Sequence, residues 1–142
     1  MTDALNHIVL IEDNETTSFL NNRLLNRLGV ARQVSSFSKA DEALTFLWGE
    51  TPAEPAEVPA GPDLVFVDLK MPGMNGFDFL ERYSQLPATV QERTVVAVLT
   101  TSMHGADTAR VAQYPNVEYL TKPLTEEKMQ RLLAKRFSGV KL

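Results

Sequence analysis

The sequence predicts an α/β fold with a doubly wound, five-stranded parallel sheet, and three observations support this fold class. Strand-like and helix-like segments alternate along the chain, as in a parallel sheet that helices cover on both faces. Three strand-like segments are short, continuous apolar runs rich in β-branched residues, which is typical of strands buried on both faces. The other two are more polar, as expected at the edges of a sheet.

The five strands are expected at His7–Ile11, Gln33–Phe37, Leu64–Val67, Thr94–Leu99 and Val117–Leu120. If the second and fifth of these, the more polar two, form the edges, the strand order is 2-1-3-4-5. In this order the winding of the chain reverses between the first and third strands. Ligands bind at such a switch point, outside the carboxyl ends of the strands, so we expect a functional site there.

Five helices are expected to connect and follow these strands. Each is indicated by apolar residues three or four positions apart, which share one face of a helix. In chain order they are marked by Leu20, Leu24 and Leu28; by Ala40, Ala43, Leu44 and Leu47; by Phe77, Leu80 and Tyr83; by an alanine-rich stripe over Ala106–Tyr114; and by Met129, Leu132, Leu133 and Phe137.

Length and composition bound the fold and exclude several function classes. The 142 residues, 44% of them hydrophobic, suit one domain over residues 1–142 with its core between residues 7 and 137. The formal charge of −4 argues against direct contact with nucleic acid, which would favour a basic surface. Without cysteine, the chain forms neither a disulfide framework nor a thiolate metal site.

Two further features concern location and loops. The N-terminus lacks the basic region and the long apolar run of a signal peptide, and no apolar run is long enough to insert into a membrane. We therefore expect a cytoplasmic protein. Residues 49–62 are rich in proline and contain three glutamates, so they are expected to form a solvated surface insertion rather than a helix or strand.

Three carboxylates are expected to meet at the switch point. Glu12 and Asp13 follow the first strand, and Asp68 follows the third. Carboxylates in such proximity repel each other, which raises a pKa or requires a cation. A few oxygen ligands suit Mg²⁺ better than Ca²⁺. Glu12 and Asp13 alone fit equally well as favourable charges at the start of a helix, but Asp68 opposite them favours a metal site.

Residues that follow two other strands are expected at the same switch point. Thr100, Thr101 and Ser102 follow the fourth strand and place hydroxyl groups there. Lys122 and Pro123 follow the fifth strand. A lysine at a strand end is usually a solvated charge, but here its ammonium would point into the acidic pocket and neutralise carboxylate or phosphoryl oxygens. The proline would then fix the direction of the lysine, with a cis peptide bond as one way to do so.

These motifs, in this order and on these strands, resemble the response-regulator receiver domain of two-component signalling. The residues that carry the resemblance are Glu12–Asp13, Asp68 before the loop MPGMNG, Thr100, and the pair Lys122–Pro123. The likeness extends from His7 to Phe137 and is to a stand-alone receiver of the chemotaxis type. It implies the flavodoxin-like arrangement of five strand–helix units.

The resemblance also implies a metal and a phosphoacceptor. Asp68 would accept the phosphoryl group. Glu12 and Asp13 would be acidic ligands of Mg²⁺, together with Asp68 and the backbone carbonyl of Lys70. Gly73 and Gly76, in the loop after Asp68, also have an ordinary interpretation as turn residues, because glycine adopts left-handed backbone at little cost.

Three further roles follow from the same resemblance. Thr100 would be the switch hydroxyl that binds the phosphoryl group, and Lys122 would contact that group. Tyr119 occupies the position of the aromatic switch residue, which would turn inward when Thr100 moves. The alternative for Tyr119 is that of an edge-strand aromatic packed on the last helix.

The implied function is signal transfer without catalysis on a separate substrate. The Asp68 carboxylate would attack a phosphohistidine of a histidine kinase or a histidine phosphotransfer protein, and water would later hydrolyse the aspartyl phosphate. The protein would therefore catalyse only its own phosphorylation and dephosphorylation. Only SGVKL follows the last expected helix, so we expect no output domain and a downstream protein effector. Whether phosphorylation produces a dimer is left open.

Several positions depart from the commonest pattern of the family. Asn116 stands where glycine is frequent, and asparagine tolerates the positive φ of such a turn. Lys70 and Ser102 occupy positions that vary in the family. Lys70 would crowd or attract the phosphoryl donor, and Ser102 provides no carboxylate or amide to orient water, so slow self-hydrolysis is expected. His7 and His104 are expected to be structural or exposed rather than phosphate carriers.

Three rival functions were weighed against the receiver. The first is a receiver-like docking module that acts without phosphorylation, and the intact set of pocket residues argues against it. The second is a phosphatase with an aspartyl nucleophile, which needs a second acid where Lys70 stands. The third is a flavodoxin-like cofactor binder, but the loop EDNETT has no glycine with which to cradle a phosphate.

Overall fold

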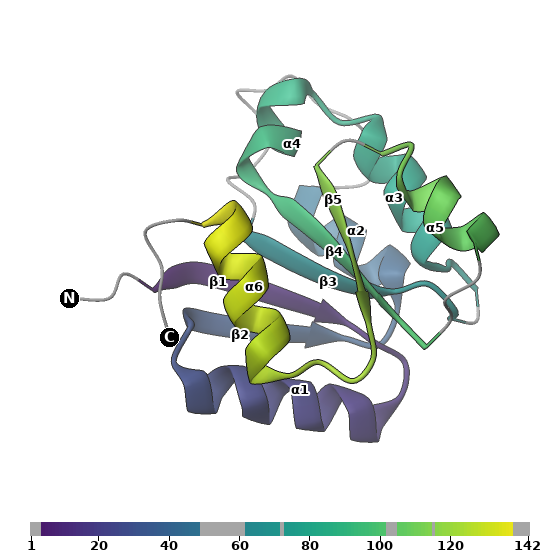
Figure 1. Ribbon diagram of the computed structural model, residues 1–142. Helices are drawn as coiled ribbons and strands as arrows, with labels where there is room; N and C mark the ends of the chain where they lie inside the picture. Colours follow the sequence, from purple (N-terminus) through teal and green to yellow (C-terminus); the bar gives the residue numbers. More distant parts are fainter. Residues whose placement is uncertain (1–3, 49–61, 72, 102–104, 115, 138–142) are drawn as a thin grey trace.

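The computed structural model describes residues 4–48, 62–71, 73–101, 105–114 and 116–137, and this part of the chain contains five strands and six helices (Figure 1). The strands are β1 (Leu5–Ile11), β2 (Ala31–Phe37), β3 (Leu64–Asp68), β4 (Val95–Thr100) and β5 (Val117–Thr121). The helices are α1 (Glu15–Leu28), α2 (Ala40–Trp48), α3 (Gly76–Ser84), α4 (Ala88–Arg93), α5 (Gly105–Val111) and α6 (Glu126–Arg136).

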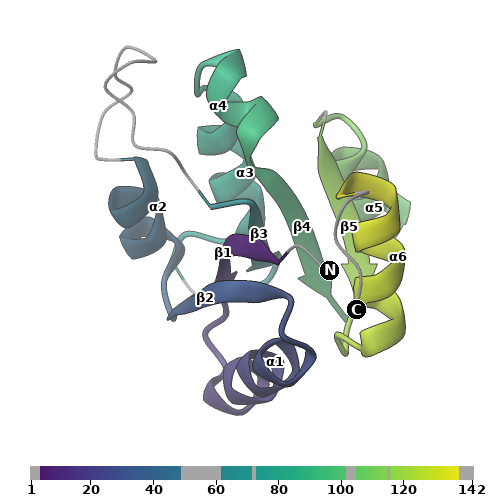
Figure 2. The ribbon, with the colours of Figure 1, turned by 90° about the vertical axis from the view of Figure 1, so that its left-hand side faces the viewer.

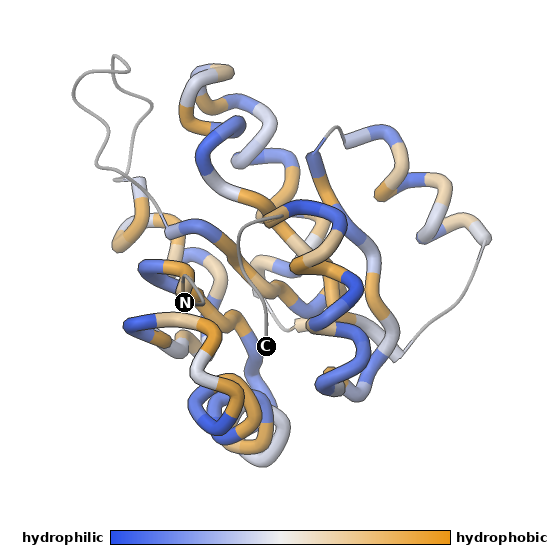
Figure 3. Tube along the Cα trace, turned by 60° about the vertical axis from the view of Figure 1, so that its left-hand side comes forward, coloured by the Kyte–Doolittle hydropathy of each residue, from blue (hydrophilic) through white to orange (hydrophobic). Residues whose placement is uncertain are grey.

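The strands form one parallel sheet in the order β2-β1-β3-β4-β5, which confirms the predicted fold class. The strands β3 and β4 are buried along their whole length, whereas no residue of β2 or β5 is fully buried. The difference follows from position, because an edge strand has a neighbour on one side only. Continuous apolar runs therefore occupy the middle of the sheet, which is largely hydrophobic in Figure 3.

Helices cover both faces of the sheet (Figure 1 and Figure 2). The core on one face includes residues of α2, α3, α4 and α5, and the core on the other includes residues of α1 and α6. Successive strand residues point to opposite faces, so Val65 and Val67 belong to the first core while Leu64 and Phe66 belong to the second. The winding thus reverses between β1 and β3, as expected.

The connection between β3 and β4 contains two helices, whereas the sequence analysis expected one. The five predicted strand–helix units are present, and the short helix α4 is additional to them. This helix has six residues, begins after Pro87, and buries only Val90. An element of this length with one buried apolar residue has no periodicity that a sequence pattern could reveal.

The buried side of helix α1 only partly matches the predicted stripe. Leu20 is 53% exposed, and Leu24 and Leu28 are only half-buried. The buried residues of α1 are Asn21 and Leu25, one position further along. The predicted stripe is confirmed for Leu24 and Leu28, which pack against the core on this face, but not for Leu20. The apolar residues of this helix extend over a wide arc, so packing selects which of them are buried most deeply.

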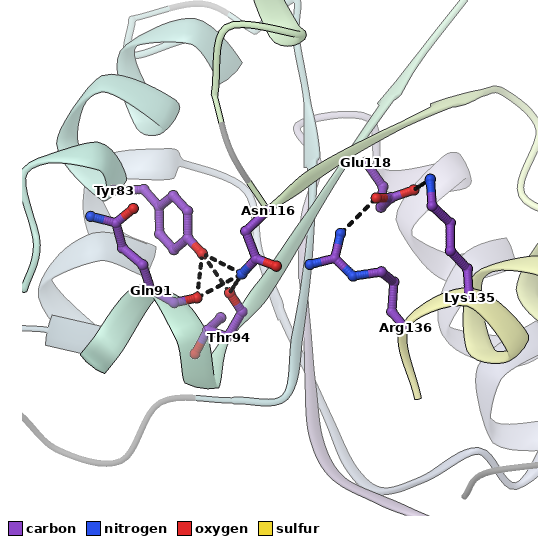
Figure 4. Close-up of polar contacts among 7 residues, drawn as sticks. All are labelled: Tyr83, Gln91, Thr94, Asn116, Glu118, Lys135 and Arg136. Carbon is purple, nitrogen blue, oxygen red and sulfur yellow. Dashed lines mark hydrogen bonds and ion pairs between the residues drawn. The ribbon is translucent and has the colours of Figure 1, made fainter. Parts of the chain in front are cut away.

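A closed polar network lies at the opposite edge of the sheet from the carboxyl ends of the strands (Figure 4). The hydroxyl of Tyr83 is 2.8 Å from the carbonyl oxygen of Gln91 and 2.6 Å from that of Thr94. The amide of Asn116 donates to the Gln91 carbonyl at 2.7 Å and to the Tyr83 hydroxyl at 3.2 Å. Asn116 has a φ of 67°, which confirms the expected tolerance of asparagine for this turn.

Two further predictions concern the proline-rich insertion and membrane-spanning segments. Except for Pro62, the proline-rich insertion at residues 49–62 lies outside the described residues. None of the helices in the described ranges has the length and apolar character needed to cross a membrane.

Candidate functional site

The candidate site lies at the edge of the sheet where four strands end. Glu12 follows β1, Asp68 ends β3, Thr100 ends β4 and Lys122 follows β5. The register pairs Asp68 with Leu99 on the neighbouring strand, so the ends of these strands lie level with each other. The structure therefore brings together the residues that the sequence analysis placed at the switch point.

Lys122 joins the two carboxylates that follow β1 and end β3. Its Nζ lies 2.5 Å from Oε1 of Glu12 and 2.9 Å from Oδ2 of Asp68. The side chains of Lys122, Glu12 and Asp68 are only 17%, 6% and 10% exposed. Ions buried to this extent lose hydration, and removing one partner leaves the others uncompensated. The lysine is therefore an integral part of the pocket rather than a solvated charge.

The backbone holds Lys122 in this position. Its N–H donates to the carbonyl of Thr100 at 2.8 Å, which continues the strand pairing beyond β5. The Lys122–Pro123 peptide bond is cis, the geometry that the sequence analysis considered for this pair. The side chain is thereby directed toward the acidic residues.

The three predicted carboxylates form a cluster that could hold a metal ion. Glu12, Asp13 and Asp68 each provide an oxygen, and these oxygens lie within 4.8 Å of one another. Glu12 and Asp68 are buried, whereas Asp13 is exposed, so the cluster is open toward solvent on one side. A cluster made only of carboxylate oxygens fits a hard divalent cation such as Mg²⁺.

Electrostatics in the pocket favour a cation. The pKa of Glu12 is raised to about 7, mainly by burial; the hydrogen bond from Lys122 offsets part of this effect, and Asp68 adds to it. Burial alone would lower the pKa of Lys122, but its hydrogen bonds to both carboxylates outweigh burial and raise that pKa. Lys122 is therefore charged at neutral pH, and the pocket still carries surplus negative charge.

The loop after β3 is tied closely to Asp68. The N–H of Lys70 donates to Oδ1 of Asp68 at 3.1 Å, and its side chain is exposed. Gly76 approaches the same backbone so closely that a Cβ there would lie 2.6 Å from the carbonyl oxygen of Asp68. Left-handed backbone is found at Gly73 but not at Gly76. The interpretation of Gly76 as a left-handed turn residue was wrong, because it is the close approach that requires glycine there.

The two predicted switch residues lie on β4 and β5. Thr100 is buried with 1% exposure at the end of β4. Tyr119 on β5 is half-buried and packs against the core that includes residues of α2, α3 and α5. The alternative packing of Tyr119 on the last helix was wrong, because side chains alternate along a strand and it is the neighbouring Glu118 that faces α6. Glu118 accepts from Lys135 and Arg136 there, at 2.9 and 2.6 Å (Figure 4).

The remaining polar residues singled out in the sequence fall into two groups. His7 is half-buried and its Nε2 lies 2.8 Å from the hydroxyl of Ser35, which fits the expected structural role. Burial lowers the pKa of His7 against an opposing effect of Asp63. Ser102 and His104 lie outside the described residues.

The sequence analysis missed one residue that lies near the site. Asn21 is the polar residue that α1 buries, and it lines a small cavity together with Glu12 and Asp68. The only signal in the sequence is an asparagine within the apolar segment FLNNRLL. That signal is weak, because it gains meaning only once the rotation of the helix is known.

Comparisons with known proteins agree with this geometry. The family model for the response regulator receiver domain matches residues 8–134. Two-component response regulator ARR14 of Arabidopsis thaliana is 32% identical over 132 residues, which are 88% of this chain but 29% of ARR14. The chain thus spans less than a third of that relative.

Two further similarities cover more than nine-tenths of both proteins. The probable chemotaxis protein CheY of Rhizobium etli is 27% identical over 134 residues, with 94% of each chain covered. The crystal structure of a two-component response regulator from Cytophaga hutchinsonii has a TM-score of 0.80 at 22% identity, covering 96% of this chain and 99% of that one. The second similarity bears on the fold alone.

Proposed function

Because this chain belongs to the response regulator receiver domain family of two-component signalling, we propose that it accepts a phosphoryl group on Asp68 with the help of Mg²⁺. The observation that carries the proposal is the ammonium of Lys122 between two buried carboxylates, beside a third that is open to solvent. This arrangement prepares a nucleophilic carboxylate, a cation site and a mobile positive charge within one pocket.

The residues present fit a magnesium ion. Glu12, Asp13 and Asp68 would hold it through carboxylate oxygens, and the backbone carbonyl of Lys70 would be a fourth ligand. The ion would offset negative charge on the transferred phosphoryl group. Its binding would also stabilise the ionised form of Glu12, whose pKa of about 7 shows that the carboxylate is hard to keep charged alone.

The chemistry of the chain itself is a nucleophilic displacement. A carboxylate oxygen of Asp68 forms a bond to phosphorus, and the bond between phosphorus and the histidine nitrogen of the donor breaks. Lys122 exchanges its hydrogen bond with Asp68 for one with a phosphoryl oxygen, so its charge stays paired throughout. Water later hydrolyses the aspartyl phosphate. We expect this step to be slow, because Ser102 provides no carboxylate or amide to orient the water.

The phosphoryl donor would be a histidine kinase or a histidine phosphotransfer protein. Phe19 and Leu20 on α1, next to the pocket, are 63% and 53% exposed. Exposed apolar residues beside a reactive group offer a contact surface for such a partner. Under this proposal the protein acts in the cytoplasm, where phosphoryl donors derived from ATP are available.

Signal output would follow from movement of Thr100 and Tyr119. Phosphorylation adds charge and strong hydrogen-bond acceptors at the end of β4. Thr100 would turn toward the phosphoryl oxygens, and Tyr119 would move into the space this leaves. The surface formed by α5, β5 and α6 would change, and a protein effector would recognise the changed surface.

The test is intact-mass analysis after incubation with Mg²⁺ and acetyl phosphate. We expect one added phosphoryl group, which disappears without Mg²⁺ and in the variant Asp68→Asn. Beryllofluoride binding serves as a second readout, because it does not depend on the lifetime of the aspartyl phosphate. Protein that binds Mg²⁺ but shows neither an adduct nor beryllofluoride binding would instead be a docking module that acts without phosphorylation.

A further inference from the structure

A second lysine contacts the short connection from β5 to α6 that carries Lys122 (Figure 1). Lys128 is half-buried and lies in the first turn of α6. Its Nζ lies 2.6 Å from the carbonyl oxygen of Thr121, 3.2 Å from the Thr121 hydroxyl and 2.9 Å from the carbonyl oxygen of Pro123. A lysine ammonium has three donors, so these contacts use all of them and fix the direction of the group.

The two carbonyl groups that Lys128 holds lie on either side of Lys122. Thr121 precedes Lys122 in the chain, and Pro123 follows it. The N–H of Lys122 itself donates to the carbonyl of Thr100 on β4. The backbone around Lys122 is thus tied to the sheet through Thr100 and to α6 through the ammonium of Lys128, while the side chain of Lys122 extends into the acidic pocket.

On the side of α1, the same connection borders a cavity of about 430 Å³. The residues around this cavity come from the connection and from α1, and they include Lys122, Pro123, Leu124, Thr17, Leu20 and Asn21. Chain that borders open space on one side depends for its position on contacts from the other side. Leu124 is buried in the core that includes residues of α6, and Lys128 holds the residues before it. Helix α6 therefore determines where the backbone of Lys122 lies.

The helix that contains Lys128 does not explain why a lysine stands there. The N-terminus of a helix carries partial positive charge, which favours acidic residues in the first turn and disfavours a lysine. Glu126 and Glu127 match this preference. The hydroxyl of Thr125 caps the helix by accepting from the backbone N–H of Lys128 at 3.2 Å, which any residue except proline could donate. The side chain of Lys128 therefore serves a purpose outside the helix.

The partners of Lys128 also differ from those of other cations on α6. Those cations form ion pairs with carboxylates: Arg131 with Glu127, and Lys135 and Arg136 with Glu118. The hydrogen bonds of Lys128 go to neutral oxygens instead. Hydrogen bonds from a charged donor are stronger than those between neutral groups, so the charge of Lys128 strengthens its hold on the backbone.

We propose that Lys128 is a positioning residue for phosphoryl transfer, because it fixes the backbone on both sides of Lys122. The inference rests on the proposed function, in which Lys122 exchanges Asp68 for a phosphoryl oxygen. During that exchange the side chain of Lys122 moves while its backbone keeps its place, so the ammonium meets the phosphoryl group in one defined position. Lys128 acts through Lys122 and does not contact the phosphoryl group.

The test is the rate of phosphorylation by acetyl phosphate with Mg²⁺, followed by intact mass on the full chain. Lys128→Met keeps the length of the side chain but loses the ammonium. We expect its rate constant to be about 10-fold lower, because a displacement on the order of 1 Å can reduce a rate by up to about 100-fold. Lys135→Met makes the same change at an exposed position of α6 and should leave the rate unchanged.

A chemical rescue separates loss of the ammonium from loss of packing. The chain contains no cysteine, so Lys128→Cys introduces a single thiol, which 2-bromoethylamine alkylates. The alkylated side chain carries an ammonium at nearly the length of lysine. Unmodified Lys128→Cys should be phosphorylated as slowly as Lys128→Met, and the alkylated protein should regain most of the wild-type rate.

Mg²⁺ affinity distinguishes positioning from a general structural defect. Lys122 competes with a cation for Glu12 and Asp68, so a less firmly held Lys122 should leave the Kd for Mg²⁺ unchanged or lower it. A disturbed pocket would raise that Kd. Titration calorimetry measures the Kd for wild type and Lys128→Met. If Lys128→Met does not fold, Lys128→Gln, which is uncharged and shorter than lysine, takes its place.

Three outcomes would count against the inference. Equal phosphorylation rates for wild type and Lys128→Met would refute the positioning role and leave the proposed function intact. A slow variant that also binds Mg²⁺ more weakly, or a Lys128→Cys protein that alkylation does not rescue, would show a purely structural role for Lys128. A wild type that gains no phosphoryl group and binds no beryllofluoride would overturn the proposed function, and the positioning role with it.

Discussion

At the carboxyl edge of the sheet, the buried polar groups are two carboxylates and one ammonium, Glu12, Asp68 and Lys122. In the Tyr83–Asn116 network at the opposite edge the polar groups are neutral, and the Tyr83 hydroxyl and the Asn116 amide lie within hydrogen-bond distance of two backbone carbonyl oxygens (Figure 4). The first set has more negative than positive charge, even before Asp13 is counted. The second set pairs donors and acceptors among its own members.

The difference between these regions is one between a binding site and a structural junction. A closed neutral network gains its full hydrogen-bond energy on folding and leaves nothing for a ligand to satisfy. Burying a charged cluster with surplus carboxylate costs desolvation free energy, and this cost is offset only when a cation binds. Substitutions at the carboxyl edge should therefore respond to Mg²⁺, whereas those at the opposite edge should not.

Replacing Lys122 with methionine should have the largest effect. It leaves Glu12 and Asp68 buried without their cation, and breaking a buried pair in this way costs about 3–5 kcal/mol. Mg²⁺ should restore part of the loss, because it replaces the missing positive charge. Urea denaturation with and without Mg²⁺ measures the loss of unfolding free energy and the part of it that Mg²⁺ restores. A loss below about 1 kcal/mol, as for a surface ion pair, would show that the lysine is not part of the pocket.

Replacing Glu12 with glutamine should stabilise the protein at pH 8 without metal. The pKa of Glu12 is about 7 in the folded state against an ordinary 4.5, so the folded state binds the proton more tightly. The stability this provides is complete below pH 4.5 and is lost as the pH rises through 7, an effect on the order of 2–3 kcal/mol. Unfolding free energies from pH 5 to 8 should fall for wild type and stay flatter for Glu12→Gln. If the unfolding free energies of wild type and Glu12→Gln fall in parallel with pH, Glu12 is not the source of the pH dependence.

Replacing Asn116 with alanine tests the closed network. The substitution removes the amide and places a side chain without local hydrogen bonds in left-handed backbone, for a combined loss of about 2 kcal/mol. Asn116→Gly keeps the backbone conformation and loses only the amide, so it should be less harmful. Neither variant should change the affinity for Mg²⁺. A shift in that affinity would mean that the two edges of the sheet are coupled.

Replacing Tyr83 with phenylalanine should have the smallest effect, about 1 kcal/mol. The aromatic ring keeps its place in the core, and the Asn116 amide still bonds the Gln91 carbonyl. Denaturant unfolding with and without Mg²⁺ should give the same loss in both conditions. A loss that Mg²⁺ reverses would contradict the separation of the two regions.

Many features of the site were predictable because they depend on strand ends alone. Glu12, Asp68 and Lys122 each lie at the carboxyl end of a predicted strand, and in a parallel sheet these ends share one edge. Their convergence follows from strand order without knowledge of any side-chain contact. The sequence also predicted that Lys122 would neutralise carboxylates in the pocket. Which oxygens it bonds, Oε1 of Glu12 and Oδ2 of Asp68, depends on side-chain conformation and comes only from the structure.

The sequence by itself determined the sheet, its order and the set of residues at its carboxyl edge, because the alternation of apolar runs and helical stripes has few compact solutions. Only the tertiary structure decided which side of α1 is buried, where Tyr119 packs, that a short α4 forms, and that Gly76 lies against Asp68. These features depend on how elements rotate and approach each other. Packing decides that, and a broad apolar arc such as that of α1 is compatible with more than one answer.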